Sequence, residues 1–550
     1  MTKSGRKRLS FEESSERSKR RKISELVSAT SSEALVKAAE KVAPKPTEAS
    51  MSTNEALSLF IDMDLSVRQY NLMRGAVNAK HENFFPSYYA IYNLKRSLIP
   101  EPIVSNEGSA EINLQNVLNA TAKSILESLP TSAQNVVLEC KWGFDGSSGH
   151  GAYKQQSEDP NLNDDFMFVV SFVPIRLYKC EDHEILWDNP KPSSSRFCRP
   201  IKFIQTKENS VVIKSEAQKL KDEISLLQPF TFDNWDIKTV CNFNMHHTMI
   251  DGAVLNVLTD NKAPSNCPFC QAKPTEMNSE KVYERSLKSE QFLQYGLSTL
   301  HCKIKFFECI IHIAYKLPFK KWIVSQSEKQ KLDDRKRKIQ NDFKTEMGLL
   351  VDKVKTGYGT SNDGNTARRF FNNIELSSKI TGVDIDLIKS FALILSIISS
   401  GYNVHVENFK NLLRNTFKLY IELYPWYYMP ATVHKVLVHG AEIVAKSVLP
   451  IGMLSEDALE ATHKVIRKAR LEHTRKCRRK DTNRDLMVYL LIYSEPILST
   501  VSIKKPTAKQ CVKNIKNFIV LSPNVAVDEE IDYEETFEQN SDSESDTDFQ

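Results

Sequence analysis

Residues 136–146, VVLECKWGFDG, and residues 240–252, VCNFNMHHTMIDG, are the two stretches that decide the fold. Each is an apolar run that stops at turn residues, so we expect a strand in each, at Val136–Phe144 and at Val240–Ile250. Neighbouring segments predict two further strands, Asp165–Tyr178 and Ile201–Gln205, and two helices, Ser215–Leu227 and Ala253–Leu258. Strands mixed with helices in this order indicate an α/β core.

Both strands are followed by an Asp-Gly pair, at Asp145 and at Asp251. An aspartate there projects from a rigid strand into the open edge of a sheet, where neighbouring carboxylates can converge. Carboxylate oxygens are the ligands that hold paired divalent ions in phosphoryl-transfer sites. Asp-Gly is also an ordinary turn sequence, and for either aspartate alone the turn is the simpler interpretation.

A Cys-Pro-Phe-Cys stretch places the thiols of Cys267 and Cys270 where a compact knuckle can direct them at one zinc ion. Two more ligands are needed, and His434 and His439 in HKVLVHG offer two imidazoles at an acceptable spacing. From the residues alone, a redox or chance pair explains the cysteines equally well, and a helix surface explains the histidines.

The segment LSEDALE predicts a helix start, for which Ser455 is a suitable cap. Glu456 and Glu460 lie four residues apart and are therefore expected on one face. The helix continues with basic residues, the first of which are Lys464, Arg467 and Lys468. This pattern would place a metal-binding acid beside a bound phosphate backbone, but complementation of the helix dipole explains it about as well.

Two further segments suit contacts with DNA phosphates. Residues 54–97 show three short helices, the last of which carries tyrosines together with Lys95 and Arg96, as in a helical DNA-binding unit. In NDGNTARRFF a turn leads into Arg368 and Arg369, a pair suited to gripping phosphates. A small helical bundle or a surface turn would give similar patterns.

Charge is distributed unevenly over the 550 residues, whose net charge is +5. Residues 1–22 hold nine Lys and Arg against three acids, whereas residues 528–550 hold eleven acids and no Lys or Arg. The middle of the chain is therefore basic, which favours a polyanionic partner such as nucleic acid. Within the basic beginning, Lys19-Arg20-Arg21-Lys22, preceded by Arg6-Lys7-Arg8, predicts a two-part nuclear import signal or an arm that contacts the DNA backbone. A solvated run of charges would have the same pattern.

Composition argues against other classes of protein. No apolar run reaches about 18 residues, so no membrane span is expected, and the charged, serine-rich beginning does not look like a secretory signal. The ten cysteines are too sparse for a secreted disulfide scaffold, so a reducing compartment is expected.

Taken in order, FDG, MIDG, CPFC, LSTLHCKI, NDGNTARRFF, HKVLVHG and LSEDALE resemble the Transib family of cut-and-paste DNA transposases and its relative, the catalytic subunit of the V(D)J recombinase. The resemblance covers roughly residues 54–500. It implies an α/β RNase H-like catalytic core with a DDE triad, interrupted by a large, mostly helical zinc-binding insertion. A helical region for DNA binding and dimerisation is implied before this core.

Carried over by motif, Asp145, Asp251 and Glu460 become the triad, which would hold two Mg²⁺ or Mn²⁺ ions. Glu460 rather than Glu456 stands at the family's position, 21 residues after His439. The ligands of one structural zinc ion become Cys267, Cys270, His434 and His439.

The implied organisation has six parts: a disordered basic tail over 1–50, a helical dimerisation and DNA-binding region over 51–133, the first part of the core over 134–259, the zinc-binding insertion over 260–454, the catalytic-Glu helix with a basic helical region over 455–500, and a mostly disordered acidic tail over 501–550.

The resemblance also implies a homodimer in the nucleus. It would nick double-stranded DNA at terminal inverted repeats, leave hairpins on the flanking DNA and join the element's 3′ ends to target DNA. No membrane and no small-molecule substrate is expected. The alternative is a domesticated, catalytically silent DNA-binding descendant, and the intact triad favours the enzyme.

Overall fold

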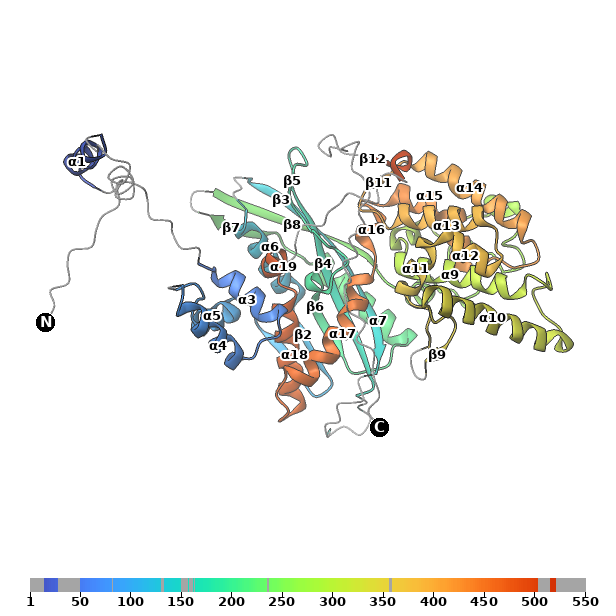
Figure 1. The fold of residues 1–550 in the computed structure, drawn as a ribbon, viewed down its shortest axis with the longest axis horizontal. Helices are drawn as coiled ribbons and strands as arrows, with labels where there is room; N and C mark the ends of the chain where they lie inside the picture. The colour runs from blue at the N-terminus through green and yellow to red at the C-terminus, as the bar shows by residue number, and fades with distance from the viewer. Residues whose placement is uncertain are drawn as a thin grey trace. The chain divides into compact units, whose positions relative to one another are not determined.

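A computed structural model gives the fold (Figure 1). It describes residues 14–27, 50–81, 83–129, 133–149, 157, 162, 164–234, 237–355, 359–502 and 515–520. The chain divides into two compact units, which are treated separately. The first holds residues 1–258 and 456–506, and the second holds residues 259–455 and 507–550.

Among the described residues, the first unit begins with the helices α1 (Glu16–Val27), α3 (Thr53–Asp62), α4 (Val67–Asn78) and α5 (Tyr88–Ser97). Ser52 and Ser66 cap α3 and α4 in reciprocal capping boxes, which fixes where these two helices begin. A common apolar cluster holds α3, α4 and α5 together, and each helix buries one side chain in it: Leu57, Tyr70 and Ile91.

An eight-stranded mixed sheet forms the centre of the first unit. Its strands are β1 (Ile103–Ser105), β2 (Ser109–Ile112), β3 (Asn135–Ser148), β4 (Phe166–Lys179), β5 (Ile185–Asp188), β6 (Arg199–Ile204), β7 (Phe230–Asn234) and β8 (Ile237–Met249). Seven of them run in the order β1-β2-β6-β4-β3-β8-β7, and β5 pairs with β4. All pairs are antiparallel except β3 with β8, which are parallel.

The helices of this unit that belong to the sheet are α6 (Leu114–Glu127), α7 (Ser210–Ser225), α8 (Gly252–Leu258), α17 (Asp457–Glu472), α18 (Arg479–Tyr493) and α19 (Pro496–Ser502), together with the 3₁₀ turn η1 (Ser195–Phe197). Helix α17 contacts β3, and α18 contacts β1, β2 and β6. A mixed sheet with helices of this kind fits the RNase H-like core that the sequence predicts.

Strands β3 and β8 approach most closely at Gly143, which pairs with Met249 at an irregularity in their register. A Cβ atom at Gly143 would lie only 1.9 Å from the carbonyl oxygen of Met249. Only glycine fits such a contact between two backbones. The contact fixes the register of the two strands two residues before Asp145 and Asp251.

The second unit is mostly helical. Its helices are α9 (Thr299–Lys316), α10 (Lys329–Met347), α11 (Gly364–Asn372), α12 (Ile374–Thr381), α13 (Ile385–Ile398), α14 (Val406–Leu423), α15 (Ala431–Lys446) and α16 (Ile451–Leu454), with 3₁₀ turns η2 (Glu280–Glu284), η3 (Glu290–Tyr295), η4 (Gln326–Glu328) and η5 (Lys516–Phe518). Two short antiparallel pairs complete it, β9 (Val354–Lys355) with β10 (Gly359–Thr360) and β11 (Asn403–Val404) with β12 (Ile519–Val520).

The structure departs from the sequence predictions in four places. Helix α1 lies within residues 1–50, which were expected to be disordered, and β1 and β2 lie within a region expected to be helical. Strand β3 continues to Ser148, so Asp145 lies inside the strand and does not end it. Strand β12 lies within the segment expected to be a mostly disordered tail, because it completes a pair with β11.

No single helix in the described part of the chain is both long and apolar enough to cross a membrane, although one bent pair of helices passes on length and composition.

Candidate active site and metal centre

Asp145 and Asp251 meet at one edge of the sheet because β3 and β8 are parallel neighbours. The paired residues Gly143 and Met249 each precede one of these aspartates by two positions. Asp145 keeps 27% of its side chain exposed. Asp251 lies just past the end of β8, and its Oδ1 accepts a hydrogen bond of 2.7 Å from the backbone N–H of Val254 in α8. Asp251 therefore caps the start of α8, and it also stands at the edge where Asp145 lies.

A third carboxylate, Glu208, joins these two from the loop between β6 and α7. Its Oε2 accepts a hydrogen bond of 2.8 Å from the backbone N–H of Gly146, next to Asp145. Burial, together with the negative charges of Asp251 and Asp145, raises the pKa of Glu208 to about 7. The three acids therefore crowd one another.

Sequence reasoning missed Glu208. It lies in a polar loop, TKENS, whose spacing from either aspartate carries no motif. Only the pairing of β6 with β4, and of β4 with β3, brings this loop to Asp145. A search for acids after every predicted strand would have included it.

Helix α17 brings His463 onto the same site. The Nε2 atom of His463 lies 3.0 Å from Oδ2 of Asp145, and its side chain is only 6% exposed. Glu460 lies one turn earlier and therefore on the same helix face, where it is exposed. One turn later, Nη1 of Arg467 donates to the carbonyl oxygen of Ser148 at the end of β3 over 3.4 Å.

The structure separates Glu460 from Glu456, which spacing alone could not do. Glu456 is buried, with 5% of its surface exposed, whereas Glu460 is exposed. Lys141 on β3 is fully buried, and burial lowers its pKa to about 8, while the negative charges of Asp457 and Glu456 oppose that shift. The charge of Glu456 therefore favours the charged form of a buried lysine, and burial distinguishes Glu456 from the exposed Glu460.

The predicted cap of this helix is also displaced by one residue. The N-cap position of α17 is held by Glu456, and Ser455 is instead the C-cap residue of α16. Glu456 makes no side-chain hydrogen bond to the first turn of α17. Helix α17 begins at Asp457, which makes Glu456 and not Ser455 the residue before it.

The basic residues predicted to bind DNA have different surroundings. Arg96, Lys464 and Arg368 are exposed, and Arg368 donates to Oδ1 of Asn365 over 2.6 Å. A guanidinium N–H of Arg369 donates to the backbone carbonyl of Met347 in the second unit.

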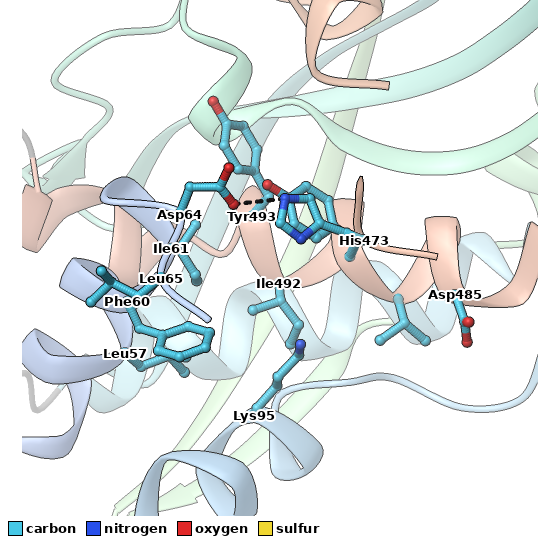
Figure 2. A pocket seen from close by; sticks show the side chains of 12 residues that line it. Leu57, Phe60, Ile61, Asp64, Leu65, Lys95, His473, Asp485, Ile492 and Tyr493 are labelled. Carbon is cyan, nitrogen blue, oxygen red and sulfur yellow. Dashed lines mark ion pairs between the residues drawn. The ribbon is translucent and has the colours of Figure 1, made fainter. Parts of the chain in front are cut away.

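Two more of the basic residues predicted to bind DNA, Lys95 and Lys468, lie close to acids of the first unit. Figure 2 shows Lys95 reaching into a cavity of about 320 Å³ whose wall includes Asp64 and Asp485. Burial lowers the pKa of Lys95, and the charge of Asp485 opposes this. The ammonium of Lys468 lies 2.7 Å from Asp64, which also lies 2.7 Å from Nε2 of His473.

The second unit gathers the four predicted zinc ligands. One ligand atom from each of the four lies within 4.8 Å of all the others, and all four residues are buried: Cys267, Cys270, His434 and His439. Sγ of Cys270 lies 3.3 Å from Nε2 of His434. The neighbouring Cys267 thiol and the two imidazoles hold the pKa of the Cys270 thiol far below its ordinary value.

Two thiols and two imidazoles at such separations form a donor set that fits one tetrahedral zinc ion. Both histidines lie on α15, and Nδ1 of His439 is 3.4 Å from a carboxylate oxygen of Glu442. A carboxylate behind a histidine ligand is the usual arrangement that fixes the ring and its tautomer. The second unit therefore contains a candidate metal centre of Cys₂His₂ type.

Comparison with known proteins adds little to this geometry. No family model matches the chain, and no curated protein matches it. Among solved structures, the Drosophila P element transposase strand transfer complex matches with a TM-score of 0.31 and 10% identity, over 88% of this chain and 100% of that chain.

Proposed function

We propose that the protein is a metal-dependent DNA-cutting and DNA-joining enzyme of the transposase class, a member of the Transib family, with Asp145, Asp251 and Glu460 as its catalytic carboxylates. The observation that carries the proposal is the convergence of acids from separate elements at one sheet edge. Asp145 and Asp251 come from adjacent parallel strands, and the negative charges of both act to raise the pKa of Glu208. Helix α17 adds Glu460 on the face that contacts Asp145 through His463.

The acids fit divalent cations such as Mg²⁺ or Mn²⁺. Burial raises the pKa of Glu208, and the nearby charges of Asp251 and Asp145 act in the same direction, to about 7; a cation bound there would relieve that repulsion. Hard oxygen donors are the ligands these ions prefer. Asp145, Asp251 and Glu460 would hold two ions, with Glu208 beside them. When bound, such ions activate the attacking oxygen and stabilise the leaving oxygen of a phosphodiester.

The chain's own residues position the substrate. His463 orients the carboxylate of Asp145, and Lys464 and Arg467 follow Glu460 at one and two turns along α17. Cations placed there would bind the DNA backbone next to the acids, and phosphate contacts fix a protein's register on the duplex. Catalysis by this arrangement would rest on positioning and charge stabilisation, with no covalent protein–DNA intermediate.

The proposed reaction is a nick beside a terminal inverted repeat, followed by hairpin formation on the flanking DNA and joining of the element's 3′ ends to target DNA. We propose that a homodimer in the nucleus carries it out. Paired ends require two active sites, and the basic segment at residues 19–22 supports nuclear import.

The Cys₂His₂ centre is proposed to hold one structural zinc ion. All four donors are protein side chains, and a closed set of that kind stabilises folding and leaves no position for a substrate. In this proposal zinc maintains the second unit, from which the chain leads directly into α17 and Glu460.

A nicking assay tests the proposal. Wild-type protein and Asp145→Asn are incubated with supercoiled plasmid carrying the repeats that flank the coding sequence, in Mg²⁺ or Mn²⁺. Nicks and hairpin ends should form with wild type and fall at least about 100-fold with Asp145→Asn. Asp188→Asn is the matched control, because Asp188 lies on the same sheet but pairs at its surface with Arg176 over 3.0 Å. Equal products from wild type and Asp145→Asn would instead support a catalytically silent DNA-binding protein.

A further inference from the structure

Four residues of α17 form one stripe that faces the hairpin of β3 and β4. Glu460, His463, Arg467 and Arg470 are spaced by three, four and three positions, which places them on one side of a helix. The last three make successive contacts: His463 with Asp145, Arg467 with the carbonyl of Ser148, and Arg470 with Asp164. The contacts therefore run from the catalytic edge outward along the hairpin.

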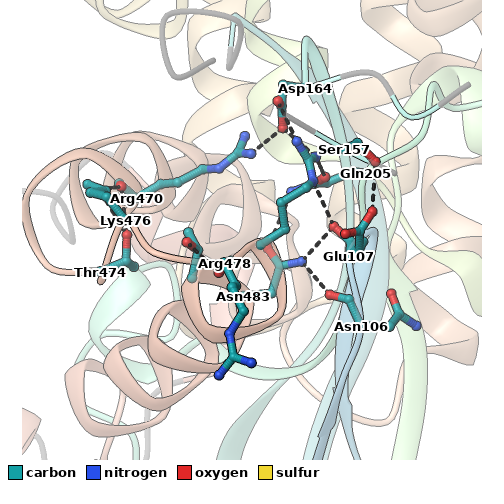
Figure 3. A network of polar contacts seen from close by, with 12 residues as sticks. Asn106, Glu107, Ser157, Asp164, Gln205, Arg470, Thr474, Lys476, Arg478 and Asn483 are labelled. Carbon is teal, nitrogen blue, oxygen red and sulfur yellow. Dashed lines mark hydrogen bonds and ion pairs between the residues drawn. The ribbon is translucent and has the colours of Figure 1, made fainter. Parts of the chain in front are cut away.

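Asp164 forms the outermost of these contacts and also binds a second arginine. Its Oδ1 accepts from Arg470 and, over 2.8 Å, from Nη2 of Arg479, while its Oδ2 accepts from Nη1 of Arg479 over 2.9 Å. Figure 3 shows Asp164 facing Arg470 across this network. Arg470 and Arg479 are 2% and 3% exposed, so one carboxylate bridges two buried guanidinium groups from α17 and α18.

Arg479 extends the connection into the sheet. It donates to the side-chain oxygen of Gln205, just after β6, and over 3.2 Å to the carbonyl oxygen of Glu107 in the β1–β2 turn. A planar guanidinium bound on several sides holds one geometry. Asp164 therefore connects α17 to a point that the sheet itself makes rigid.

We infer that Asp164 is a positioning residue for Glu460: by bridging Arg470 and Arg479 it fixes the rotation and axial position of α17 relative to β3, an inference that rests on the proposed function. Arg470 lies ten residues after Glu460, about 15 Å along the helix axis. A contact at that distance controls the direction of the helix, whereas His463 beside Asp145 controls its separation from the strand.

Asp164 lies far from the carboxylates that would hold the metal ions. Its loss should therefore change the Mg²⁺ concentration needed for nicking more than the affinity for DNA. A displacement of about 1 Å at a reacting group is enough to cost about 100-fold in rate. Removing a supporting contact around a metal site commonly costs about 10-fold to 100-fold in metal affinity. Removal of an acid from a basic surface does not weaken its attraction for phosphates.

The test compares Asp164→Ala with Asp485→Ala in the full chain. Asp485 on α18 also pairs with an arginine, Arg475, over 2.9 Å, so its loss removes the same charge and a more exposed ion pair without touching the hairpin. Plasmid nicking is measured over a Mg²⁺ titration, together with the Kd for the same DNA. Asp164→Ala should need about tenfold more Mg²⁺ for half-maximal nicking, with a Kd unchanged within about twofold. Asp164→Glu, which keeps the charge, should recover most of the activity.

Each other outcome decides against the inference or against the proposed function, but not both. Equal Mg²⁺ requirements for Asp164→Ala and Asp485→Ala, with wild type active, would overturn the positioning role alone. Wild type no more active than Asp145→Asn would overturn the enzyme, and amide hydrogen exchange would then test the bridge by itself. Exchange along Leu459–Ala469 should be faster in Asp164→Ala than in Asp485→Ala. If Asp164→Ala does not fold, Asp164→Asn, which retains one acceptor oxygen, replaces it in both measurements.

Discussion

Replacement of Glu456 by glutamine should reduce stability in a way that depends on pH. Burial lowers the pKa of Lys141 to about 8 from an ordinary 10.5, although Asp457 and Glu456 oppose the shift. The remaining difference of about 2.5 pH units corresponds to about 3 kcal/mol of cost for keeping Lys141 charged at pH 7. Loss of one of the two opposing acids should add about 1–2 kcal/mol to that cost.

The sign of the pH effect follows from proton binding. Between pH 8 and 10.5 the unfolded chain holds the Lys141 proton, whereas the folded chain has released it. The contribution of Lys141 to the free energy of unfolding therefore rises with pH in this range. Once Lys141 is neutral it gains nothing from Glu456. The difference between wild type and Glu456→Gln should therefore be largest near pH 7 and should fade above about pH 8 to 9.

Urea unfolding at pH 7, 8 and 9 measures this difference directly. Glu460→Gln is the matched control, since Glu460 is exposed on the same helix and its loss should change stability by less than about 0.5 kcal/mol while abolishing nicking. The reasoning would be refuted if Glu456→Gln were as stable as wild type at pH 7. A destabilisation that stayed constant from pH 7 to pH 9 would refute the role of Lys141.

Three further changes have defined outcomes. Gly143→Ala places a Cβ 1.9 Å from the Met249 carbonyl and should cost about 3 kcal/mol or more in urea unfolding, whereas Gly75→Ala, with nothing within 4 Å, should not destabilise. Purified protein should carry one zinc ion per chain by elemental analysis. The Cys270→Ser variant should lose this zinc, have a lower melting temperature and nick less DNA. An unchanged zinc content in the variant would contradict the Cys₂His₂ centre. Arg467→Ala should reduce the salt dependence of DNA binding by about one unit of slope, and Lys468→Ala by less because Lys468 pairs with Asp64 over 2.7 Å; the reverse order would contradict the proposed DNA surface.

Much of the fold could be read from local patterns. The apolar run at Val136–Phe144 lies within β3, and the run at Val240–Ile250 matches β8 except for its last residue. These features depend on neighbours within a few residues, which the sequence displays directly. The end of β3 was placed too early, because its last residues are held by β4, a partner that the local pattern does not reveal.

Two aspartates and four possible metal ligands are recognisable in the sequence alone. A strand followed by Asp-Gly marks Asp145 and Asp251 as candidates, and the CPFC and HKVLVHG segments offer four candidate metal ligands by their chemical type. Without the family resemblance, spacing left Glu456 and Glu460 as equal choices. The periodicity of a helix gives both acids one face and says nothing about which of them is buried.

Only the tertiary structure decided the rest. Parallel pairing of β3 with β8 sets the two aspartates side by side, and the loop after β6 adds Glu208, which no motif indicated. Burial sets Glu456 apart from the exposed Glu460, and helix periodicity places Glu460 one turn from His463, which contacts Asp145. The physical reason is the same in each case: convergence and burial depend on which segments pack together across hundreds of residues, and local spacing does not encode that.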